Sequence, residues 1–503
     1  MRFLSLRDAR RLPFWILPLL VGVVVMLLPV LGAPRGTLRM MVTIALLSML
    51  VAGLNIAFGY AGELALGQSA IYAAGAYFAG YFAVQGLDLP ITLVIAVIAA
   101  MGVGLLTGGP GLRLGSWSLG MVTFFLVLLL PDIVALLREY TGGSAGLSGI
   151  PLPSVFGTKL DSETYYMLVI AMTILVFALL RNYVVSRHGN ALKVMRESPV
   201  LARSLGYSIT RIKLSAYVIS AMPAGVAGTL FAYQEGYVSD VSFGFSMAVA
   251  ILAASIIGGS ASIYGAAFGA AILVIGPLRA TALQQFSLPF FGLLLIVGGL
   301  FFRGGIAELL QRFVRARIIK DDLMPDVERA IAEKAELPAI AGKPLRASGI
   351  VKRFGGNTAL AGVDLEATPG RVTALIGPNG SGKTTLLNVI GGFLKADEGV
   401  VTLGDRDVTG LAAHQLAAAG IARTFQTPQI PKGLTVAEVV QVARYRAEPT
   451  SIVSGMLTLP GTRRAMRRDR EEAVRLLSIM GIAHLADRPA EELPLGTRRI
   501  LEV

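Results

Sequence analysis

The chain has 503 residues, of which 54% are hydrophobic and 15% are charged, whereas soluble domains carry about 25% charged residues. This composition excludes an ordinary soluble enzyme and predicts a protein that lies largely in a membrane. The net charge of +13 is compatible with nucleic-acid binding, but polytopic membrane proteins also gather Lys and Arg in their cytoplasmic loops. The sequence has no cysteine and therefore neither disulfides nor thiolate metal sites.

The N-terminal segment predicts a retained first membrane span. Four arginines lie within residues 1–11, and an apolar run from Phe14 to Leu31 follows them. A cleaved signal peptide has a similar pattern, but this run is as long as a spanning helix of about 20 residues, and further apolar segments follow at once. These further spans are expected at 39–58, 64–84, 89–107, 117–137, 165–184 and 213–233, as a glycine-broken pair across 246–280, and at 285–302, which makes about ten in all.

The basic residues predict the orientation of these spans. The segment between 185 and 213 contains six Lys and Arg residues and a single acid, Glu197, and more basic residues follow the last span. With a cytoplasmic N-terminus, six spans return the first basic segment to the cytoplasm and four more return the tail, as the positive-inside rule requires. Topology thus explains the basic excess, and no nucleic-acid partner is expected.

Residues 59–69, with the sequence GYAGELALGQS, form the most suggestive cluster within the spans. Glu63 is an ionisable residue between two apolar stretches, and such a residue is a candidate functional residue. The surrounding glycines allow close helix packing, or they interrupt helices that line a cavity. Glu63 and Gln68 are therefore candidate residues of a substrate path. The alternative is that Glu63 lies at the membrane surface in the first turn of a helix.

Two segments between spans predict contacts with partners. The Gly-, Ser- and Pro-rich stretch 138–163 is typical of an ordered loop on the non-cytoplasmic side, which either meets a substrate-delivering partner or serves as a connector. Residues 188–213 have helical periodicity with both charged and apolar side chains. Such a cytoplasmic helix docks into another domain or lies on the lipid surface.

The membrane half resembles the permease subunits of branched-chain amino acid importers of the ABC superfamily, over nearly all of residues 40–303. The resemblance rests on TGGSAGLSGIPLPSVFG, on the run from 191 to 232 and on Ile257-Gly258-Gly259-Ser260. It implies a coupling helix after residue 185 that sits in a cleft of the ATP-binding subunit. The coupling contacts are expected near Met195, Arg196, Glu197 and Leu205.

Hydropathy falls and charges alternate after residue 303, which predicts a partly helical cytoplasmic linker. The expected domains are a permease domain at 1–303, a linker at 304–344 and an ATP-binding domain at 345–503. All residues after 303 are expected in the cytosol.

Residues 377–384 form a complete phosphate loop of the pattern G-x-x-x-x-G-K-[ST]. The apolar run 372–376 before it has the length of a strand, and residues 385–390 open an amphipathic helix. The glycines let backbone N–H groups turn toward phosphate oxygens, and the helix adds its positive N-terminal end. Lys383 should reach the β and γ phosphates and Thr384 should ligate Mg²⁺. The expected nucleotide-binding residues are Gly377, Pro378, Asn379, Gly380, Ser381, Gly382, Lys383, Thr384 and Thr385.

Residues 345–503 resemble the ATP-binding subunit of the same importer class. By this resemblance Phe354 stacks on adenine, Gln426 helps to hold Mg²⁺ and senses the γ-phosphate, and residues 428–487 form the helical subdomain that receives the coupling helix. A run similar to the ABC signature would offer N–H donors to an ATP held on the opposing subunit. This run is Leu493, Pro494, Leu495 and Gly496, followed by Thr497 where a glutamine is usual and by Arg498 and Arg499.

The given sequence has no residue that we assign to catalysis. The second phosphate-site Asp, the catalytic Glu and the switch His of ABC ATPases have no counterpart before Val503. Residues 401–405 are not that phosphate-site strand, because they contain Thr and Gly, lack a following Glu and precede Gln426. Hydrolysis needs a group that orients the attacking water, so we expect a truncated version of a longer reading frame. Its parallel sheet would expose apolar edges.

These features predict a polytopic α-helical membrane domain followed by an incomplete α/β P-loop NTPase domain of the ABC type. The predicted function is ATP-driven import of branched-chain or related amino acids across a bacterial inner membrane, with ATP and Mg²⁺ as cofactors. By resemblance, the assembly needs a second permease subunit, a second ATP-binding subunit and an extracytoplasmic solute-binding protein. Two alternatives stay open: import of urea, an amide or another small polar solute, and a nonhydrolytic nucleotide-binding remnant.

Overall fold

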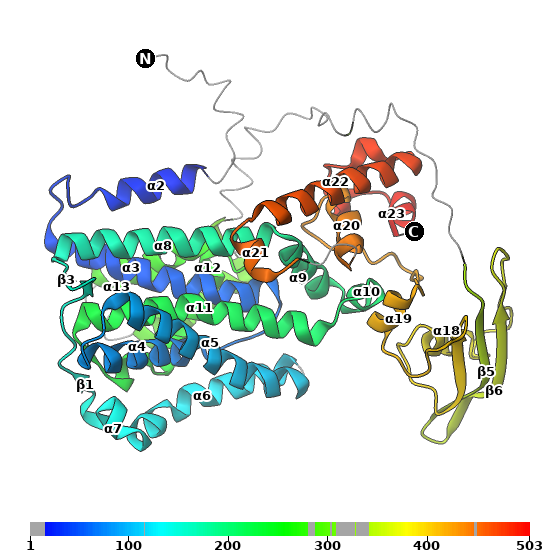
Figure 1. Ribbon diagram of the computed structural model, residues 1–503, viewed down its shortest axis with the longest axis horizontal. Coiled ribbons are helices and arrows are strands. Elements are labelled where there is room, and N and C mark those ends of the chain that lie inside the picture. Colours follow the sequence, from blue (N-terminus) through cyan, green and yellow to red (C-terminus); the bar gives the residue numbers. More distant parts are fainter. Residues whose placement is uncertain are drawn as a thin grey trace, which may run out of the picture. The chain divides into compact units, whose positions relative to one another are not determined.

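The computed structural model describes residues 16–114, 116–279, 287–301, 304–307, 327, 342–446 and 450–502 (Figure 1). The chain separates into two compact units. The first unit comprises Met1–Leu192, Thr210–Asp321 and Ile452–Thr458, and the second comprises Lys193–Ile209, Asp322–Ser451 and Leu459–Val503. The predicted linker lies almost wholly outside the described residues, as do the arginines of residues 1–11. The domain boundaries at 303 and 344 therefore stay a prediction.

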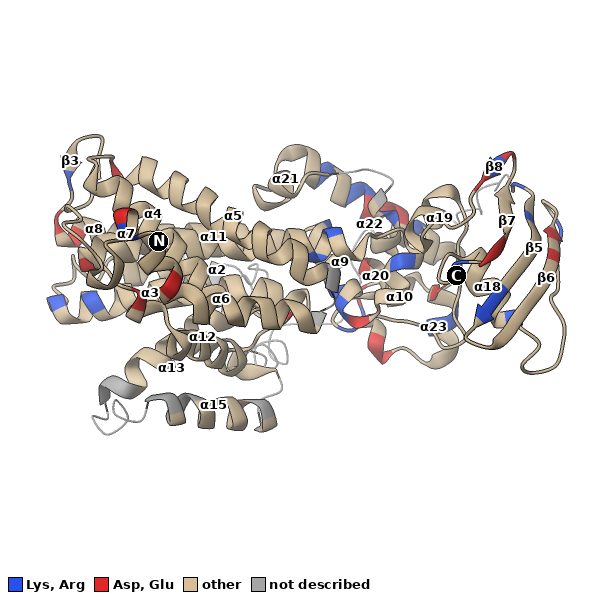
Figure 2. Cartoon of the chain, turned by 90° about the horizontal axis from the view of Figure 1, so that it is seen from below, with Lys and Arg blue, Asp and Glu red and all other residues tan. Residues whose placement is uncertain are grey.

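The first unit is a bundle whose helices fall where the sequence predicts spans. They are α2 (Ile16–Met26), α3 (Arg35–Leu54), α4 (Gln68–Val84), α5 (Leu89–Leu114), α6 (Ser116–Leu136), α8 (Ser162–Val185), α11 (Ile209–Glu235), α12 (Phe245–Gly258), α13 (Gly265–Arg279) and α15 (Ser287–Phe301). Among the described residues, six helical stretches are long and apolar enough to cross a membrane. The others are shorter, so a count of ten spans is not confirmed. Figure 2 shows the charged residues of this unit mostly toward the ends of its helices.

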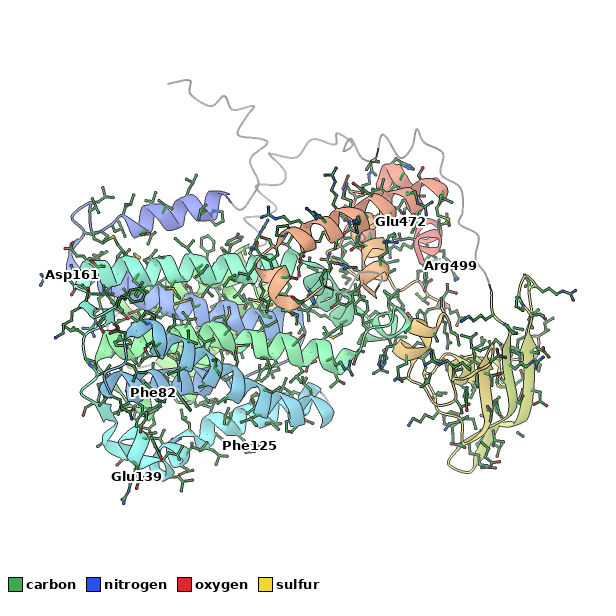
Figure 3. All side chains as sticks on the ribbon, in the orientation of Figure 1. Phe82, Phe125, Glu139, Asp161, Glu472 and Arg499 are labelled. Carbon is green, nitrogen blue, oxygen red and sulfur yellow. The ribbon has the colours of Figure 1, made fainter. Side chains whose placement is uncertain are left out.

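The centre of the bundle is formed by α3 and α11. Their most apolar windows are 78% and 72% buried, whereas those of α5, α6 and α8 are 28% to 33% buried. The outer helices expose apolar side chains such as Phe125, which is labelled on α6 in Figure 3. Small residues let the central helices approach one another: a Cβ on Gly228 of α11 would lie 2.6 Å from the backbone N of Ala76 on α4. Such close packing is what small residues provide in lipid.

The loops predicted on the non-cytoplasmic side are joined by hydrogen bonds. Strand β1 (Leu147–Ser148) pairs with β4 (Tyr237–Val238), which follows α11. The carboxylate of Asp88, between α4 and α5, accepts a hydrogen bond of 2.9 Å from the backbone N–H of Gly157. Segments that follow the third, fifth and seventh predicted spans thus meet one another. This agrees with the predicted orientation and with an ordered loop at 138–163.

Two breaks interrupt helices of the bundle and contact each other. The first follows α3, which ends in the π-helical turn η1 (Asn55–Tyr60), and leaves residues 61–67 non-helical. The second separates α12 from α13. Asn55 donates from Nδ2 to the carbonyl oxygens of Gly259, at 3.2 Å, and Ser262, at 2.7 Å. A side-chain amide therefore satisfies carbonyl groups that the second break has freed, which is what backbone inside a membrane requires.

The second unit contains a four-stranded antiparallel sheet with the order β6-β5-β7-β8. The strands are β5 (Leu345–Phe354), β6 (Asn357–Ala367), β7 (Glu398–Leu403) and β8 (Arg406–Asp407). The helix predicted after the phosphate loop is α18 (Lys383–Ile390). Its side chains Leu386 and Ile390 are buried in one apolar cluster with Ile350 and Leu360 of the sheet. Residues 401–403 lie in β7 and pair antiparallel with β5, which agrees with their exclusion as a phosphate-site strand.

The strand predicted at 372–376 is not formed, and this prediction was wrong. The segment has no regular structure, and its side chains Val372 and Ile376 are 99% and 89% exposed. Within the described residues, no strand pairs with it. The backbone groups of a strand need hydrogen-bond partners on neighbouring strands, so an apolar run cannot form a strand by itself. The segment is instead an exposed apolar stretch before the phosphate loop.

The other α-helices of the second unit differ in length, from the 6 residues of α10 to the 20 residues of α22. They include α10 (Pro199–Ser204), α19 (Ala413–Ala419), α20 (Val436–Ala443), α22 (Pro460–Ile479) and α23 (Leu495–Glu502), while α9 (Arg187–Glu197) belongs to both units. The predicted subdomain 428–487 is mostly helical, but α21 (Ile452–Met456) belongs to the first unit and packs on α8. There Asn182 Nδ2 donates to the carbonyl oxygen of Met456 at 3.0 Å.

Candidate functional site

The phosphate loop requires glycine at two of its positions. Gly380 and Gly382 have φ angles of +87° and +86°, in the left-handed region that favours glycine. A Cβ on Gly382 would also lie 2.7 Å from the carbonyl oxygen of Ala359 on β6. The loop therefore turns tightly against the sheet, as the motif predicts.

The N-terminus of α18 and the ammonium of Lys383 face this loop. The helix begins at Lys383 with Gly382 as its N-cap, and no side chain caps its first N–H groups. Lys383 Nζ donates to the carbonyl oxygens of Gly377 and Pro378, both at 2.7 Å, so that the ammonium lies within the loop. Uncapped N–H donors, the positive end of a helix and a held ammonium together fit an anionic phosphate group. Thr384 stands in the same first turn.

Phe354 is the last residue of β5 and pairs with Asn357 at the hairpin that joins β5 to β6. Two residues earlier on β5, Lys352 pairs with Leu360 of β6. Leu360 follows Ala359, whose carbonyl oxygen lies close to Gly382 of the loop. Phe354 is 48% exposed, and Lys352 Nζ lies 5.6 Å from the centre of its ring. An exposed aromatic ring on the hairpin that the phosphate loop approaches at Ala359 fits the stacking role that the resemblance implies.

Gln426 lies in a non-helical segment and is exposed. Its carbonyl oxygen accepts a hydrogen bond of 2.6 Å from Arg499 Nη2 on α23, which Figure 3 labels, and the N–H of Phe425 donates to Glu502 Oε1 at 2.9 Å. These bonds join Gln426 to the signature helix and not to the phosphate loop. Its role as an Mg²⁺ ligand stays a prediction.

Arg423 links the same segment to α18, and sequence reasoning missed this residue. Its Nη1 donates to the carbonyl oxygen of Leu387 at 3.1 Å and to Asn388 Oδ1 at 2.7 Å. Its guanidinium also lies 5.2 Å and 5.7 Å from the ring centres of Phe393 and Phe425. The sequence did contain a signal for this contact. Arg423 stands two residues before Phe425, and residues at this spacing lie on the same face of an extended segment.

The signature-like run lies at the start of α23. Leu493 is buried, whereas Pro494, Leu495 and Gly496 are exposed. Arg498 stabilises this turn, because its Nε donates to the carbonyl oxygen of Leu493 at 2.7 Å. The N-terminus of α23 is thus held on the surface of the second unit. This placement agrees with a role toward a partner subunit, which stays a prediction.

The predicted coupling segment packs on helices of the second unit through residues that the sequence did not single out. Met195 is buried, Leu205 is half-buried, and Arg196 and Glu197 are exposed. Helix α10 packs on α19. Two hydrogen bonds hold the segment: Ser198 Oγ donates to Gln429 Oε1 at 3.0 Å, and the hydroxyl of Tyr207 donates to the carbonyl oxygen of Val442 at 2.6 Å. Signals for both were present, since Ser198 precedes a proline as an N-cap does and Tyr207 is a large aromatic residue beside a glycine.

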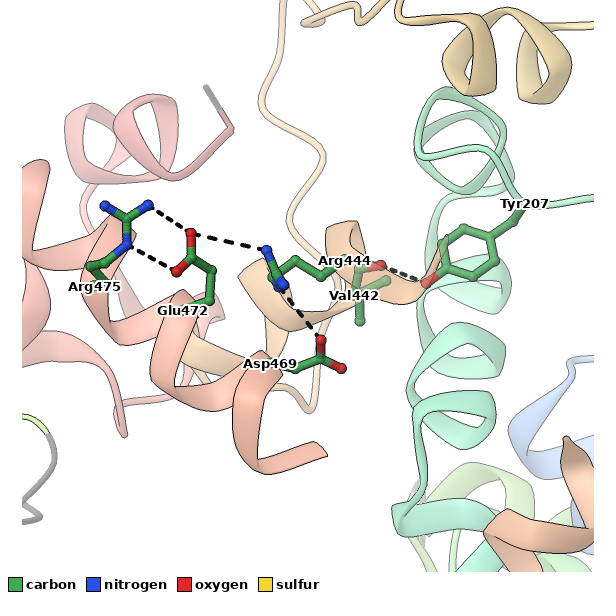
Figure 4. A network of polar contacts seen from close by, with 6 residues as sticks. All are labelled: Tyr207, Val442, Arg444, Asp469, Glu472 and Arg475. Atoms are coloured by element: carbon green, nitrogen blue, oxygen red, sulfur yellow. Dashed lines mark hydrogen bonds and ion pairs between the residues drawn. The ribbon is translucent and has the colours of Figure 1, made fainter. Parts of the chain in front are cut away.

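A polar network holds the surface that Tyr207 contacts (Figure 4). The ring of Tyr207 lies 5.0 Å from that of Tyr445, and the neighbouring Arg444 reaches the buried Asp469 of α22 with an N–O distance of 3.5 Å. Arg475 contacts Glu472 at 2.7 Å, and its hydrogen bond holds the pKa of Glu472 below the usual value. The network therefore fixes the end of α20 against α22.

The two candidate residues of the membrane path both contact α11. Glu63 forms an ion pair with Lys213, and Gln68 Nε2 donates to the carbonyl oxygen of Ser220 at 2.8 Å. Glu63 is buried and lies in the non-helical segment 61–67. The predicted alternative of a position in the first turn of a helix is therefore wrong, whereas a position near the membrane surface stays a prediction. The structure brings the two residues to one helix, and their contact with a substrate stays a prediction.

Comparison with known proteins identifies both halves. A family described as the permease component of the branched-chain amino acid transport system matches residues 36–298, and the ABC transporter family matches residues 360–503. The permease protein LivM of Escherichia coli, from a high-affinity branched-chain amino acid transport system, is 32% identical over 291 residues, which are 52% of this chain and 68% of LivM. LivM of Salmonella typhimurium has the same identity and coverage.

The second half is similar to ATP-binding proteins but matches only part of them. The branched-chain amino acid transport ATP-binding protein LivG of Escherichia coli is 38% identical over 159 residues, which are 32% of this chain and 62% of LivG. A solved nucleotide-free ATP-binding cassette from an ABC transporter is 41% identical, with a TM-score of 0.27, over 32% of this chain and 62% of that one. Because the permease family covers more than half of its length, the chain belongs to the branched-chain amino acid transport system permease family, joined here to an ABC-type domain.

Proposed function

We propose that this chain supplies one permease domain and one ATP-binding domain of an ABC importer for branched-chain or related amino acids. The observation that carries the proposal is the presence, in one chain, of a permease-family bundle and of a phosphate loop whose geometry suits a nucleotide. LivM and LivG are separate proteins with these two roles in their names. A chain that joins them places transport and nucleotide binding in one molecule.

The proposal extends to location and partners. The bundle would lie in a bacterial inner membrane, with residues after 303 in the cytosol and 304–344 as a linker between domains 1–303 and 345–503. By the resemblance, the phosphate loop binds ATP in its own domain, whereas the signature contacts the ATP of the opposing domain. Two ATP-binding domains are therefore needed. The assembly would therefore include a second permease subunit, a second ATP-binding subunit and an extracytoplasmic solute-binding protein.

Nucleotide binding would use the residues around the loop. When bound, ATP with Mg²⁺ would supply phosphate charge for two ATP-binding domains to share. Lys383 and the first N–H groups of α18 would hold the phosphates, and Phe354 would stack on the base. Thr384 and Gln426 would be the Mg²⁺ ligands. Pro494 to Gly496, exposed at the start of α23, would meet the nucleotide of the partner.

The coupling contacts would pass the movement of the ATP-binding domain to the bundle. Ser198 holds the segment 193–209 to Gln429 and Tyr207 holds it to α20, and α11 continues along the chain from Ile209. A displacement of α20 would therefore act on the start of a central helix of the permease. This is how binding of nucleotide would change which side of the path is open.

The test is ATPase turnover of the chain, reconstituted in lipid with its partner subunits, with and without leucine. Leucine-stimulated turnover that Lys383→Ala abolishes supports the proposal. The matched control is Lys432→Ala, an exposed lysine of the same unit, which should leave turnover unchanged. Stimulation by urea or acetamide in place of leucine would favour the polar-solute alternative. Nucleotide binding without turnover under any of these conditions would favour a nonhydrolytic role.

A further inference from the structure

A buried ion pair fastens the first helix break to α11. Lys213 Nζ contacts Glu63 Oε1, and the two side chains are 17% and 2% exposed. Charged side chains inside an apolar bundle are costly unless they are paired, and they mark functional positions. The pair joins residues that are 150 positions apart in the sequence, so it connects two elements and not two turns of one helix.

The break is attached to the same face of α11 at a second point. Gln68 Nε2 donates to the carbonyl oxygen of Ser220 at 2.8 Å. Lys213 and Ser220 are seven residues apart, which is about two turns, so they lie on one face of the helix. The segment 61–68 therefore runs along α11 with a polar attachment near each of its ends.

The ion pair lies near the end of α11 that we assign to the cytoplasm. The helix begins at Ile209, and Lys213 follows about one turn later. At its other end, Glu235 pairs with Arg39 at 2.8 Å, next to the loops predicted on the non-cytoplasmic side. Each end of this central helix thus has an ion pair, and the pair at Lys213 is much less exposed than the pair at Glu235.

We propose that the ion pair of Glu63 and Lys213 closes the cytoplasmic end of the permease path. It holds segment 61–67 against α11, and the path opens to the cytoplasm when the two side chains separate. The inference rests on the proposed function for the direction of transport and for the cargo. It gives Glu63 a role in closing the path, whereas the sequence predicted contact with the substrate.

An ion pair suits this role because its strength depends on water. Without water at the site, separating the two charges is unfavourable, because each side chain loses an opposite charge in a surrounding of low dielectric. Once water enters the opening end, both charges are hydrated and their attraction falls, because water screens it. The closed and the hydrated open arrangements are therefore both accessible. An apolar contact lacks this property, since water opposes its separation. Lys213 also stands on the helix that follows the coupling segment, so movement of α11 reaches it early.

The test uses the absence of cysteine from the sequence, which allows single reporters without background. Ala65→Cys places a thiol within segment 61–67 at a buried position. Labelling of the full-length chain by a membrane-impermeant maleimide is measured in inside-out vesicles. With the pair intact the thiol is protected, and Glu63→Gln or Lys213→Met should raise its labelling rate about ten-fold or more. The charge exchange Glu63→Lys with Lys213→Glu should restore protection.

Two controls complete the design. The matched exchange is Arg39→Glu with Glu235→Arg at the other end of α11, which should leave the labelling rate of the Ala65→Cys reporter unchanged. The folding reporter is Ala76→Cys on α4, a fully buried position that stays protected in any folded bundle. If a single charge substitution exposes this reporter too, the charge exchange decides, because restored protection at both positions again supports the pair.

Unchanged labelling in both single variants would overturn the inference, and so would a charge exchange that fails to restore protection. The measurement needs neither turnover nor cargo. It therefore stands apart from the ATPase test: loss of leucine stimulation would refute the proposed function without altering the labelling result, and unchanged labelling would refute the closing role alone.

Discussion

The membrane bundle and the segment before the phosphate loop respond differently to the same kind of sequence signal. The apolar run predicted at 39–58 lies within a continuous helix, α3 with η1, whereas the run 372–376 is exposed and has no regular structure. A helix satisfies its backbone groups within one segment, but a strand depends on neighbours. A local apolar pattern is therefore sufficient to predict the first element and insufficient to predict the second.

The bundle itself depends on long-range contacts where its helices are interrupted, and the largest effect is expected there. A Cβ on Gly59 would overlap the carbonyl group of Ser260 in the second break. Gly59→Ala should therefore cost about 3 kcal/mol of stability, because the two breaks must move apart. The measurement is the thermal unfolding midpoint of the purified chain in detergent.

The matched substitution is Gly102→Ala on α5, where nothing lies within 4 Å of the added Cβ. It should be neutral or stabilise by up to about 1 kcal/mol, because alanine is the better helix former. Equal midpoints for the Gly59 and Gly102 variants would show that the breaks do not depend on close approach. Local sequence would then be sufficient to determine the structure of the breaks, as it is for the helices.

The same division between local and long-range contacts decides what the sequence could predict. The phosphate loop, α18 and the long helices of the bundle follow from consecutive residues, and the sequence predicted them. The partner of Glu63 lies 150 positions away in Lys213, and that of Tyr207 lies in α20. Motif and periodicity carry no information about such pairs. The second unit also includes residues 193–209, which the chain order alone would assign to the bundle.

The network of Figure 4 allows a test of whether helices α20 and α22 depend on the contact between Arg444 and Asp469, as the two helix breaks depend on theirs. Asp469→Asn removes the charge that faces Arg444 and should cost about 2 kcal/mol, because a buried polar contact is lost. Glu471→Gln on the same helix removes an exposed pair with Arg467 and should change stability by at most about 0.5 kcal/mol. Chemical unfolding of the two variants compares them directly. Similar midpoints would mean that α20 and α22 are held by their apolar core alone.

A smaller effect on stability is expected for Tyr207→Phe. The variant keeps the ring beside Tyr445 but loses the hydrogen bond to the carbonyl oxygen of Val442, which should cost about 1 kcal/mol. If this bond transmits movement, leucine stimulation of turnover should fall while nucleotide binding stays unchanged. The control is Tyr237→Phe, which loses a bond of 2.9 Å to the carbonyl oxygen of Ala145 in the loops. Equal stimulation in both variants would remove Tyr207 from the coupling contacts.

The smallest effect is expected in the segment that fails to form a strand, and it tests the opening comparison most directly. Val372→Thr and Ile376→Thr change exposed side chains and should each alter stability by less than about 0.5 kcal/mol. Ile350→Thr on β5 makes the same exchange at a fully buried position and should cost about 2 kcal/mol. Unfolding midpoints of the chain alone and of the assembled transporter are measured for all three. If Val372→Thr and Ile376→Thr become as costly as Ile350→Thr after assembly, the segment gains its neighbours there, because only burial makes a hydroxyl in place of an alkyl group expensive.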